Sequence, residues 1–412
     1  MSETSHLDLD YVRGHLPGLG NGWAFFDNAG GTQILSGVVE RMNEFLFNRN
    51  VQTGGTYEVS QAAARSLAEG RDAMMRLVNA SRPEEIVFAP STTVALQNLA
   101  RSMSPRFEAG TEVVVTMTDH ESNIGPWVGL ERAGVRVRFW EPDRDTLELD
   151  LADLDRLMSK RTKLVAVTHT SNILGTINPI AEIAEFVHER GALICVDSVA
   201  CAPHRAIDVQ RLGVDFLVFS LYKVFGPHYA VMFGRYDLLA ELESLYHYFY
   251  GKDKVPAKLE PGNASYELAY GSIGIVDYLS RLGARACGTD STRAGISAAF
   301  AAITRHESEI GERLLAYLRD RDDCRIVGRT RGDDPGRVPT ISFRIDGRRS
   351  GDIARRVDDH NIAIRFGDFH ARRLVEFLDL DEPDGVVRVS MTHYNTLDEV
   401  DALIAALDGI LG

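Results

Sequence analysis

Short apolar runs alternate with helical segments through the middle of the chain, and this alternation limits the possible fold more than any other feature. Runs typical of buried strands occur at 85–88, 113–116, 135–140, 164–168, 192–196, 216–219 and 230–234. Helical periodicity separates several of them, as at 94–103, 150–158 and 180–190. The pattern predicts an α/β fold with a doubly wound, mainly parallel sheet, whose ligands bind at the carboxyl ends of the strands.

A single lysine stands just beyond one of these strand ends. The run Phe216–Phe219 leads into Ser220, Tyr222 and Lys223, and a Gly-Pro turn follows. Burial at a strand end lowers the pKa of an ammonium group, and a neutral amine can form a Schiff base with an aldehyde. A lone lysine after a strand more often extends into solvent, so its neighbours have to decide between the two interpretations.

A carboxylate at the end of a neighbouring strand favours the chemical interpretation. Asp197 ends the run 192–196, and a carboxylate in that place can hold the protonated ring nitrogen of pyridoxal phosphate. Ser91, Thr92 and Thr93 open a helix, where hydroxyl and free N–H groups can bind a phosphate. The same residues are ordinary helix caps, but together with Lys223 and Asp197 they favour a phosphate site.

These motifs resemble those of the class V aminotransferase family. The similarity rests on Asp197-Ser198-Val199-Ala200, Ala202-Pro203-His204 and Ser220–Pro227, and it extends from Phe26–Gly30 to Tyr394-Asn395-Thr396. The cysteine desulfurase-like branch is the most similar. The resemblance implies the pyridoxal phosphate fold type I, with an N-terminal segment (1–30) near the active site, a large cofactor-binding domain (31–290) and a smaller α+β C-terminal domain (291–412).

The resemblance also implies roles for individual residues. The expected catalytic residues are Lys223, His120 and Tyr222. The expected cofactor-binding residues are Thr92, Thr93, His120, Asn172, Asp197, Ser220, Lys223 and Asn263, and the expected substrate-binding residues are Asn28, Arg388, Arg365 and His370. A guanidinium such as that of Arg388 suits a carboxylate, whereas Arg365 could equally be a structural partner. By kinship we expect a homodimer with the active site at the subunit interface, in which Asn263 replaces the usual threonine.

Three departures from the desulfurase pattern bear on the reaction. The branch places a sulfur-accepting cysteine after an Arg-x-Gly stretch, and here Arg365-Phe366-Gly367 is followed by His370 at that position. Ala200 replaces an expected glutamine, and Tyr222 an expected histidine. We therefore predict no persulfide-forming activity. Whether Tyr222, Asp368 and His370 are catalytic or only shape the pocket stays open.

Several reactions remain compatible with this site. The leading hypothesis is a C–S lyase that eliminates a thiol from an S-substituted cysteine. The alternatives are transamination or an oxidative deamination coupled to decarboxylation, then epimerisation, and last a non-catalytic partner protein that binds the cofactor.

Composition limits the partners. The formal net charge of −14 and the sequence pI near 5.4 argue against nucleic acid, and the absence of a leader or long apolar window leads us to expect a cytoplasmic protein without membrane contact. The four cysteines form no CxxC pair, and Glu121 completes no HExxH motif. We therefore expect free thiols, no bound metal and a small amino-acid substrate.

Overall fold

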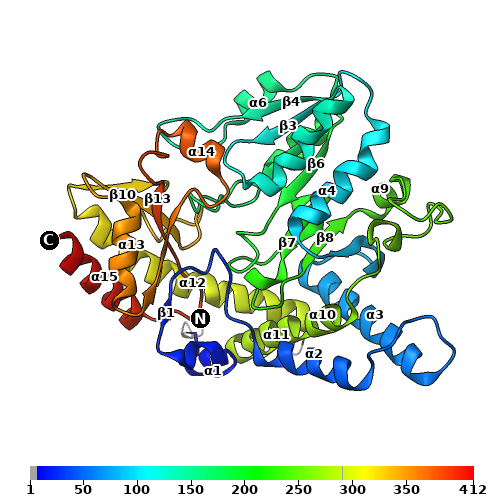
Figure 1. Cartoon of the computed structure of the whole chain (residues 1–412), viewed down its shortest axis with the longest axis horizontal. Helices are drawn as coiled ribbons and strands as arrows, with labels where there is room; N and C mark the ends of the chain where they lie inside the picture. The colour runs from blue at the N-terminus through cyan, green and yellow to red at the C-terminus, as the bar shows by residue number, and fades with distance from the viewer. Residues whose placement is uncertain (1–6, 290) are drawn as a thin grey trace.

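A computed structural model describes residues 7–289 and 291–412 (Figure 1). Its largest sheet has the strand order β2-β8-β7-β6-β5-β3-β4. The strands are β2 (Ile86–Ala89), β3 (Glu112–Thr116), β4 (Arg136–Trp140), β5 (Thr162–Thr168), β6 (Leu193–Asp197), β7 (Phe216–Ser220) and β8 (Ala230–Gly234). In this sheet of the described chain, β8 runs opposite to the other six strands, which are parallel to one another. The predicted doubly wound, mainly parallel sheet is confirmed.

Helices pack on both faces of this sheet because successive side chains of a strand point to opposite faces. On β3, Val113 and Val115 join the core formed with α4 (Thr92–Met103), while Val114 joins the opposite core with α7 (Ile180–Glu189). The other helices of this region are α2 (Ser36–Asn48), α3 (Glu58–Val78), α5 (Gly125–Val128), α6 (Leu151–Leu157), α8 (Val209–Leu212) and α9 (Tyr236–Glu241).

A second, antiparallel sheet lies beside the first and appears in yellow to red in Figure 1. It contains β12 (Arg365–Gly367), β13 (Val386–Ser390), β10 (Thr340–Ile345) and β9 (Cys324–Val327), in that order. The helices α12 (Thr292–Arg319), α13 (Ser350–Asp358), α14 (Arg372–Phe377) and α15 (Leu397–Leu411) belong to this part of the chain. The domain boundaries at 30/31 and 290/291 stay predictions, and residue 290 is outside the described residues.

The N-terminal segment packs against the C-terminal part of the chain. After α1 (Leu9–Gly14), strand β1 (Ala24–Phe25) pairs in parallel with β11 (Ile362–Ala363), and Asp27 forms a bridge with Ser390. The sequence pattern predicts one strand over 362–365, but the structure divides this stretch between β11 and β12. Residues 24–28 are thereby fixed next to Arg365 and Arg388.

Several helices have no counterpart in the sequence prediction. Two of them, α10 (Tyr266–Gly271) and α11 (Ile273–Cys287), follow one another, and α11 contains two glycines, which lower helix propensity. Gly283 faces α12, where an added Cβ would overlap the backbone of Gly295. Close packing between the two helices therefore stabilises a segment whose local sequence gives a weak helix signal.

Within the described residues, no group of three or more His, Cys, Asp or Glu side chains is arranged to hold a metal ion. None of the helices in this part of the chain has the length and apolar character needed to cross a membrane.

Candidate active site

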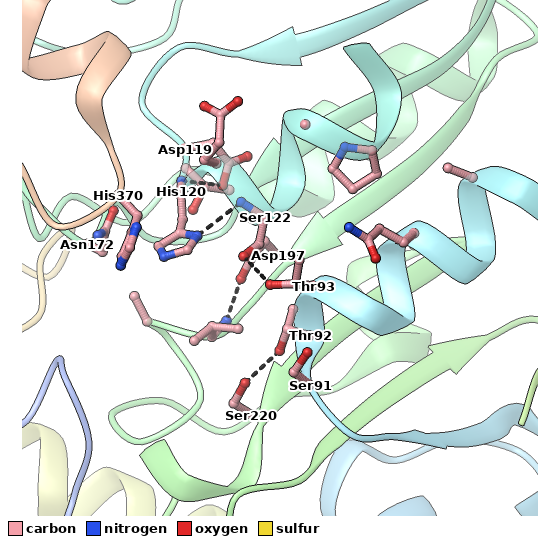
Figure 2. Close-up of a pocket in the computed structure, with 18 of the residues that line it drawn as sticks. Ser91, Thr92, Thr93, Asp119, His120, Ser122, Asn172, Asp197, Ser220 and His370 are labelled. Carbon is pink, nitrogen blue, oxygen red and sulfur yellow. Dashed lines mark hydrogen bonds between the residues drawn. The ribbon is translucent and has the colours of Figure 1, made fainter. Parts of the chain in front are cut away.

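A cavity of about 780 Å³ opens at the carboxyl ends of the strands of the large sheet (Figure 2). Nine of the residues singled out from the sequence line it: Thr92, Thr93, His120, Asn172, Asp197, Ser220, Tyr222, Lys223 and His370. They come from loops that follow β2, β3, β5, β6 and β7, and from the loop after β12. The fold thus brings together side chains that are up to 278 positions apart in the sequence (370 − 92 = 278).

Lys223 lies in a short 3-10 turn after β7 and is buried. Burial and, to a smaller extent, the positive charge of Arg388 lower the pKa of its ammonium group to about 8, although Asp197 and Asp27 oppose the shift. Thr32 holds the turn, since its Oγ1 accepts from the Phe225 N–H at 2.9 Å. A large fraction of the amine is therefore neutral slightly above neutral pH, as bond formation with an aldehyde requires.

Asp197 ends β6 and is buried with one strong hydrogen bond, which the Val199 N–H donates to Oδ1 at 2.8 Å. Burial raises its pKa to about 6. The neighbouring Asp119 is also buried, and its pKa is raised first by burial and then by the charge of Asp197. Two carboxyl groups in one buried place favour a cationic ligand beside them.

His120 follows β3, and its imidazole is neutral. Burial, together with the charges of Lys223, His370 and Arg388, lowers its pKa to about 3. The Ser122 N–H donates to its Nδ1 at 3.0 Å, which assigns the ring proton to Nε2. A flat, neutral ring in this position can stack on an aromatic cofactor.

Hydroxyl groups gather at the N-terminus of α4. Ser91 is the cap, because its Oγ accepts from the Val94 N–H at 3.2 Å. Thr92 shares a hydrogen bond of 2.6 Å with Ser220, and Thr93 shares one of 2.8 Å with Ser122 (Figure 2). The helix N-terminus and these hydroxyls form the donor set that a phosphate prefers.

Asn172 connects the cavity with the loop after β12. Its Nδ2 donates to the Phe369 carbonyl at 2.9 Å, while its buried Oδ1 has no hydrogen-bond partner within the described residues. An unpartnered buried acceptor of this kind fits a hydroxyl group on a ligand. The lysine, the carboxylate, the neutral imidazole and the hydroxyls are likewise the groups that pyridoxal phosphate requires.

Arg388 stands on β13 and is almost completely buried, which lowers its pKa to about 10. It donates to the Asn172 carbonyl and to Asp27 Oδ1, each at 3.2 Å. Its Nε has no partner within the described residues. Arg365 is half-exposed and lies 3.5 Å from the other oxygen of Asp27. Both predicted substrate-binding arginines therefore share one carboxylate, which the sequence did not single out.

Four predicted residues do not line the cavity: the two arginines just described, Asn28 and Asn263. Asn28 is buried and donates through Nδ2 to the carbonyls of Phe25 and Ser390 and to Asn395 Oδ1, so its amide has a structural role. Asn263 is exposed in a turn with a positive φ of 71°. Their expected contacts with substrate and cofactor stay predictions.

The loop 368–370 reaches over the cavity beside His120. The His370 ring centroid lies 5.2 Å from that of His120, as Figure 2 shows for the labelled pair. Both Phe369 and His370 have a positive φ, of 52° and 59°. Phe369 stacks on Arg388, whose Cζ is 3.7 Å from the ring centroid.

The cysteine thiols of the described residues lie outside the cavity. None of the four is in a disulfide in this part of the chain. Cys195 and Cys201 are fully buried, and burial raises the pKa of both thiols, that of Cys201 to about 11. These two buried thiols are therefore protonated and inert at neutral pH.

Sequence reasoning missed three residues of the site: Asp27, Asp119 and Phe369. Each lies next to a residue that was identified, but its role depends on partners distant in the sequence. Asp119, for example, accepts hydrogen bonds from Thr116, from Asn123 and from the His120 N–H. Adjacency to His120 was the one signal for it in the sequence.

Comparisons with known proteins agree with this geometry. A family model described as aminotransferase class V matches residues 24–403. An aminotransferase-like protein of Gibberella zeae is 40% identical over 99% of this chain and 100% of its own length. A cysteine desulfurase-like protein of Aspergillus flavus is 35% identical over 98% and 91%. The solved structure of a cysteine desulfurase from Thermococcus onnurineus has 27% identity and a TM-score of 0.87, covering 100% and 99% of the two chains.

Proposed function

The chain belongs to the class-V aminotransferase family and is therefore a pyridoxal-phosphate-dependent enzyme, and from this premise we propose that it releases thiols from S-substituted cysteines by β-elimination. One observation carries the proposal: His370 occupies the cavity at the position where the desulfurase-like branch has its sulfur-accepting cysteine. A sulfur atom at Cβ can then leave as a thiol without forming a persulfide on the protein.

The cofactor's role is to withdraw electrons from Cα of the amino acid, which makes the Cα proton acidic. Asp197 would hold a proton on the ring nitrogen, and Thr92, Thr93 and Ser220 would bind the phosphate. His120 would offer its neutral ring to the cofactor ring, and Asn172 would accept from the ring hydroxyl through its free Oδ1. The burial and hydrogen bonding of each side chain support these assignments.

Arg388 binds the substrate carboxylate. In doing so, the guanidinium exchanges its hydrogen bond to Asp27 Oδ1 for bonds to the substrate. Lys223 removes the Cα proton. The bond between Cβ and sulfur then breaks, and sulfur leaves with the electron pair. The overall reaction consumes one water molecule and yields a thiol, pyruvate and ammonia from each S-substituted cysteine.

The relatives support this substrate class. The Aspergillus flavus relative is described as cysteine desulfurase-like, which points to a sulfur-containing amino acid. Transamination is the second candidate, because the Gibberella zeae relative is described as aminotransferase-like. In this chain transamination would use the same Lys223 and Asp197. Decarboxylation-coupled deamination uses these groups as well and differs in releasing CO2. Epimerisation would release neither a thiol nor CO2.

The active site is proposed to be completed in a homodimer. Asn263 is exposed outside the cavity of its own chain, and α2 exposes the apolar side chains of Val39, Leu46 and Phe47. We assign the α2 surface to the dimer contact and Asn263 to the partner's phosphate site. Sedimentation should give the mass of two chains, and Asn263→Ala should weaken cofactor binding; a single-chain mass would contradict the assignment.

The experiment for the reaction uses purified protein loaded with pyridoxal phosphate and a panel of cysteine, S-methylcysteine and S-benzylcysteine. Free thiol, pyruvate, ammonia and CO2 are measured, together with the visible spectrum. We expect thiol, pyruvate and ammonia in equal amounts from at least one thioether, and none with Lys223→Ala. Accumulation of the aminated cofactor would favour transamination, and CO2 release would favour the decarboxylating route.

A further inference from the structure

The loop that carries His370 is attached to the cavity on two sides by its backbone. The Glu121 N–H, just after His120, donates to the His370 carbonyl at 2.8 Å. On the other side, Asn172 Nδ2 donates to the Phe369 carbonyl at 2.9 Å. Asp368 Oδ1 accepts from the His370 N–H at 3.1 Å. The position of residue 370 is thus tied to the ends of both β3 and β5.

Backbone strain at the same place indicates a functional constraint. Phe369 and His370 are consecutive residues in the left-handed region, which non-glycine residues adopt only at an energetic cost. The stacking of Phe369 on Arg388 and the bonds above hold this conformation. The result is a ring that projects beside His120 at the entrance of the cavity.

The imidazole of His370 is free to act. It makes no hydrogen bond or ion pair with any other described residue, although it lines the cavity and is exposed. His120 cannot supply a proton in the same way, because its pKa is lowered to about 3 by burial and it is already neutral. Lys223 is engaged at Cα. Two other cavity-lining side chains, Tyr222 and His370, can give a proton to a departing group at Cβ.

We propose that His370 is a catalytic residue that donates a proton to the sulfur leaving Cβ of the substrate. This inference rests on the proposed β-elimination. The imidazolium of His370 gives its proton to sulfur as the Cβ–S bond breaks, so that a neutral thiol departs and a neutral imidazole remains. The exposed ring then takes a proton from water, and no oxidation or reduction occurs. Histidine suits this task, because imidazole is the side chain that most often serves as a general acid or base.

The test compares two leaving groups. S-benzylcysteine must release a thiol, whereas β-chloroalanine releases chloride, which needs no proton. We expect His370→Gln to slow thiol release on the order of 10²-fold while chloride release stays nearly unchanged. His360→Gln, which removes an exposed histidine near the end of α13, is the matched control and should affect neither substrate.

The outcomes separate the two proposals. If the wild-type protein releases no thiol from any conjugate, the proposed function fails, and the inference fails with it. If the wild type releases thiol but His370→Gln slows both substrates equally or slows neither, only the inference fails. A selective loss with Tyr222→Phe in place of His370→Gln would transfer the role to Tyr222.

A second measurement does not depend on turnover or on a variant that folds. Diethyl pyrocarbonate modifies accessible neutral imidazoles, and the modified peptides are quantified by mass spectrometry. The probe is α-methyl-S-benzylcysteine, which lacks the Cα proton and cannot be turned over. We expect it to protect His370 in the holoenzyme and to leave His360 unprotected. Equal modification of His370 with and without the probe would overturn the inference.

Discussion

The floor and the rim of the cavity are built in different ways. Lys223, Asp197 and Thr92 form the floor at strand ends of the large sheet, and all three are buried. The rim is the loop 368–370, which comes from the smaller sheet, has two residues with positive φ and presents an exposed histidine. We assign the cofactor chemistry to the floor, whereas a loop outside the large sheet can differ without disturbing that sheet. Reaction type is therefore expected to follow the rim.

The strongest test of the floor is Lys223→Ala. We expect activity to fall on the order of 10⁴-fold, because the variant loses both the covalent attachment of the cofactor and the group that removes the Cα proton. Turnover and the visible spectrum of the loaded protein measure the two losses. Lys223→Arg keeps the charge and should be equally inactive; a tenth of wild-type activity in either variant would contradict the assignment.

Asp197→Asn tests whether a floor carboxylate acts on the cofactor. The amide can still accept from the Val199 N–H but cannot stabilise a proton on the ring nitrogen. Activity should fall on the order of 10²–10³-fold, the range found when one preorganised electrostatic contact is removed. Glu121→Gln removes another cavity-lining carboxylate, which pairs with Arg373, and should have a much smaller effect. Equal losses in the two variants would argue against a special role of Asp197.

Phe369→Ala tests the rim. Its ring stacks on the buried guanidinium of Arg388, a contact worth about 2 kcal/mol when desolvated. We expect KM to rise roughly tenfold because Arg388 is less well oriented, while cofactor affinity is unchanged. Phe366→Ala, which removes a more exposed ring of the adjoining strand β12, is the control. Loss of cofactor binding in Phe369→Ala would show that floor and rim are not separable.

The smallest expected effect is on the pH dependence of cofactor attachment to Lys223. Since burial lowers the pKa of Lys223 to about 8, the rate at which the apoprotein attaches pyridoxal phosphate should rise up to about pH 8 and then level off. Asp197 raises that pKa, so Asp197→Asn should move the bend to lower pH. Stopped-flow absorbance between pH 6 and 10 measures this. A rate that still rises toward pH 10, as expected for the ordinary lysine pKa of 10.5, would mean that the amine is not desolvated.

The floor was predictable from sequence because its signals are local. A buried strand followed by Lys223, another ending at Asp197 and hydroxyls before a helix each mark their own position, and the alternating pattern predicts that they meet at one edge of the sheet. The same reasoning predicted the strands of the large sheet well. It gave no element over α10 and α11, where glycine contacts between helices outweigh propensity.

The rim was predictable in part only. The sequence identified His370 through its place after Arg365-Phe366-Gly367, but its approach to His120 depends on the Glu121 and Asn172 hydrogen bonds, which join distant segments. The sharing of Asp27 by Arg388 and Arg365 likewise arises from the pairing of β1 with β11. Such contacts depend on how the two sheets are placed, and no local pattern encodes them.

The central claim is that residue 370 decides whether sulfur remains on the protein or leaves it. The most direct test is the intact mass of the wild-type protein and of His370→Cys after incubation with cysteine and removal of the free amino acid. We predict that the wild type gains no sulfur, while His370→Cys gains one sulfur atom that a reductant removes. Reducible sulfur on the wild-type protein, or its absence from His370→Cys with the cofactor bound, would contradict the account.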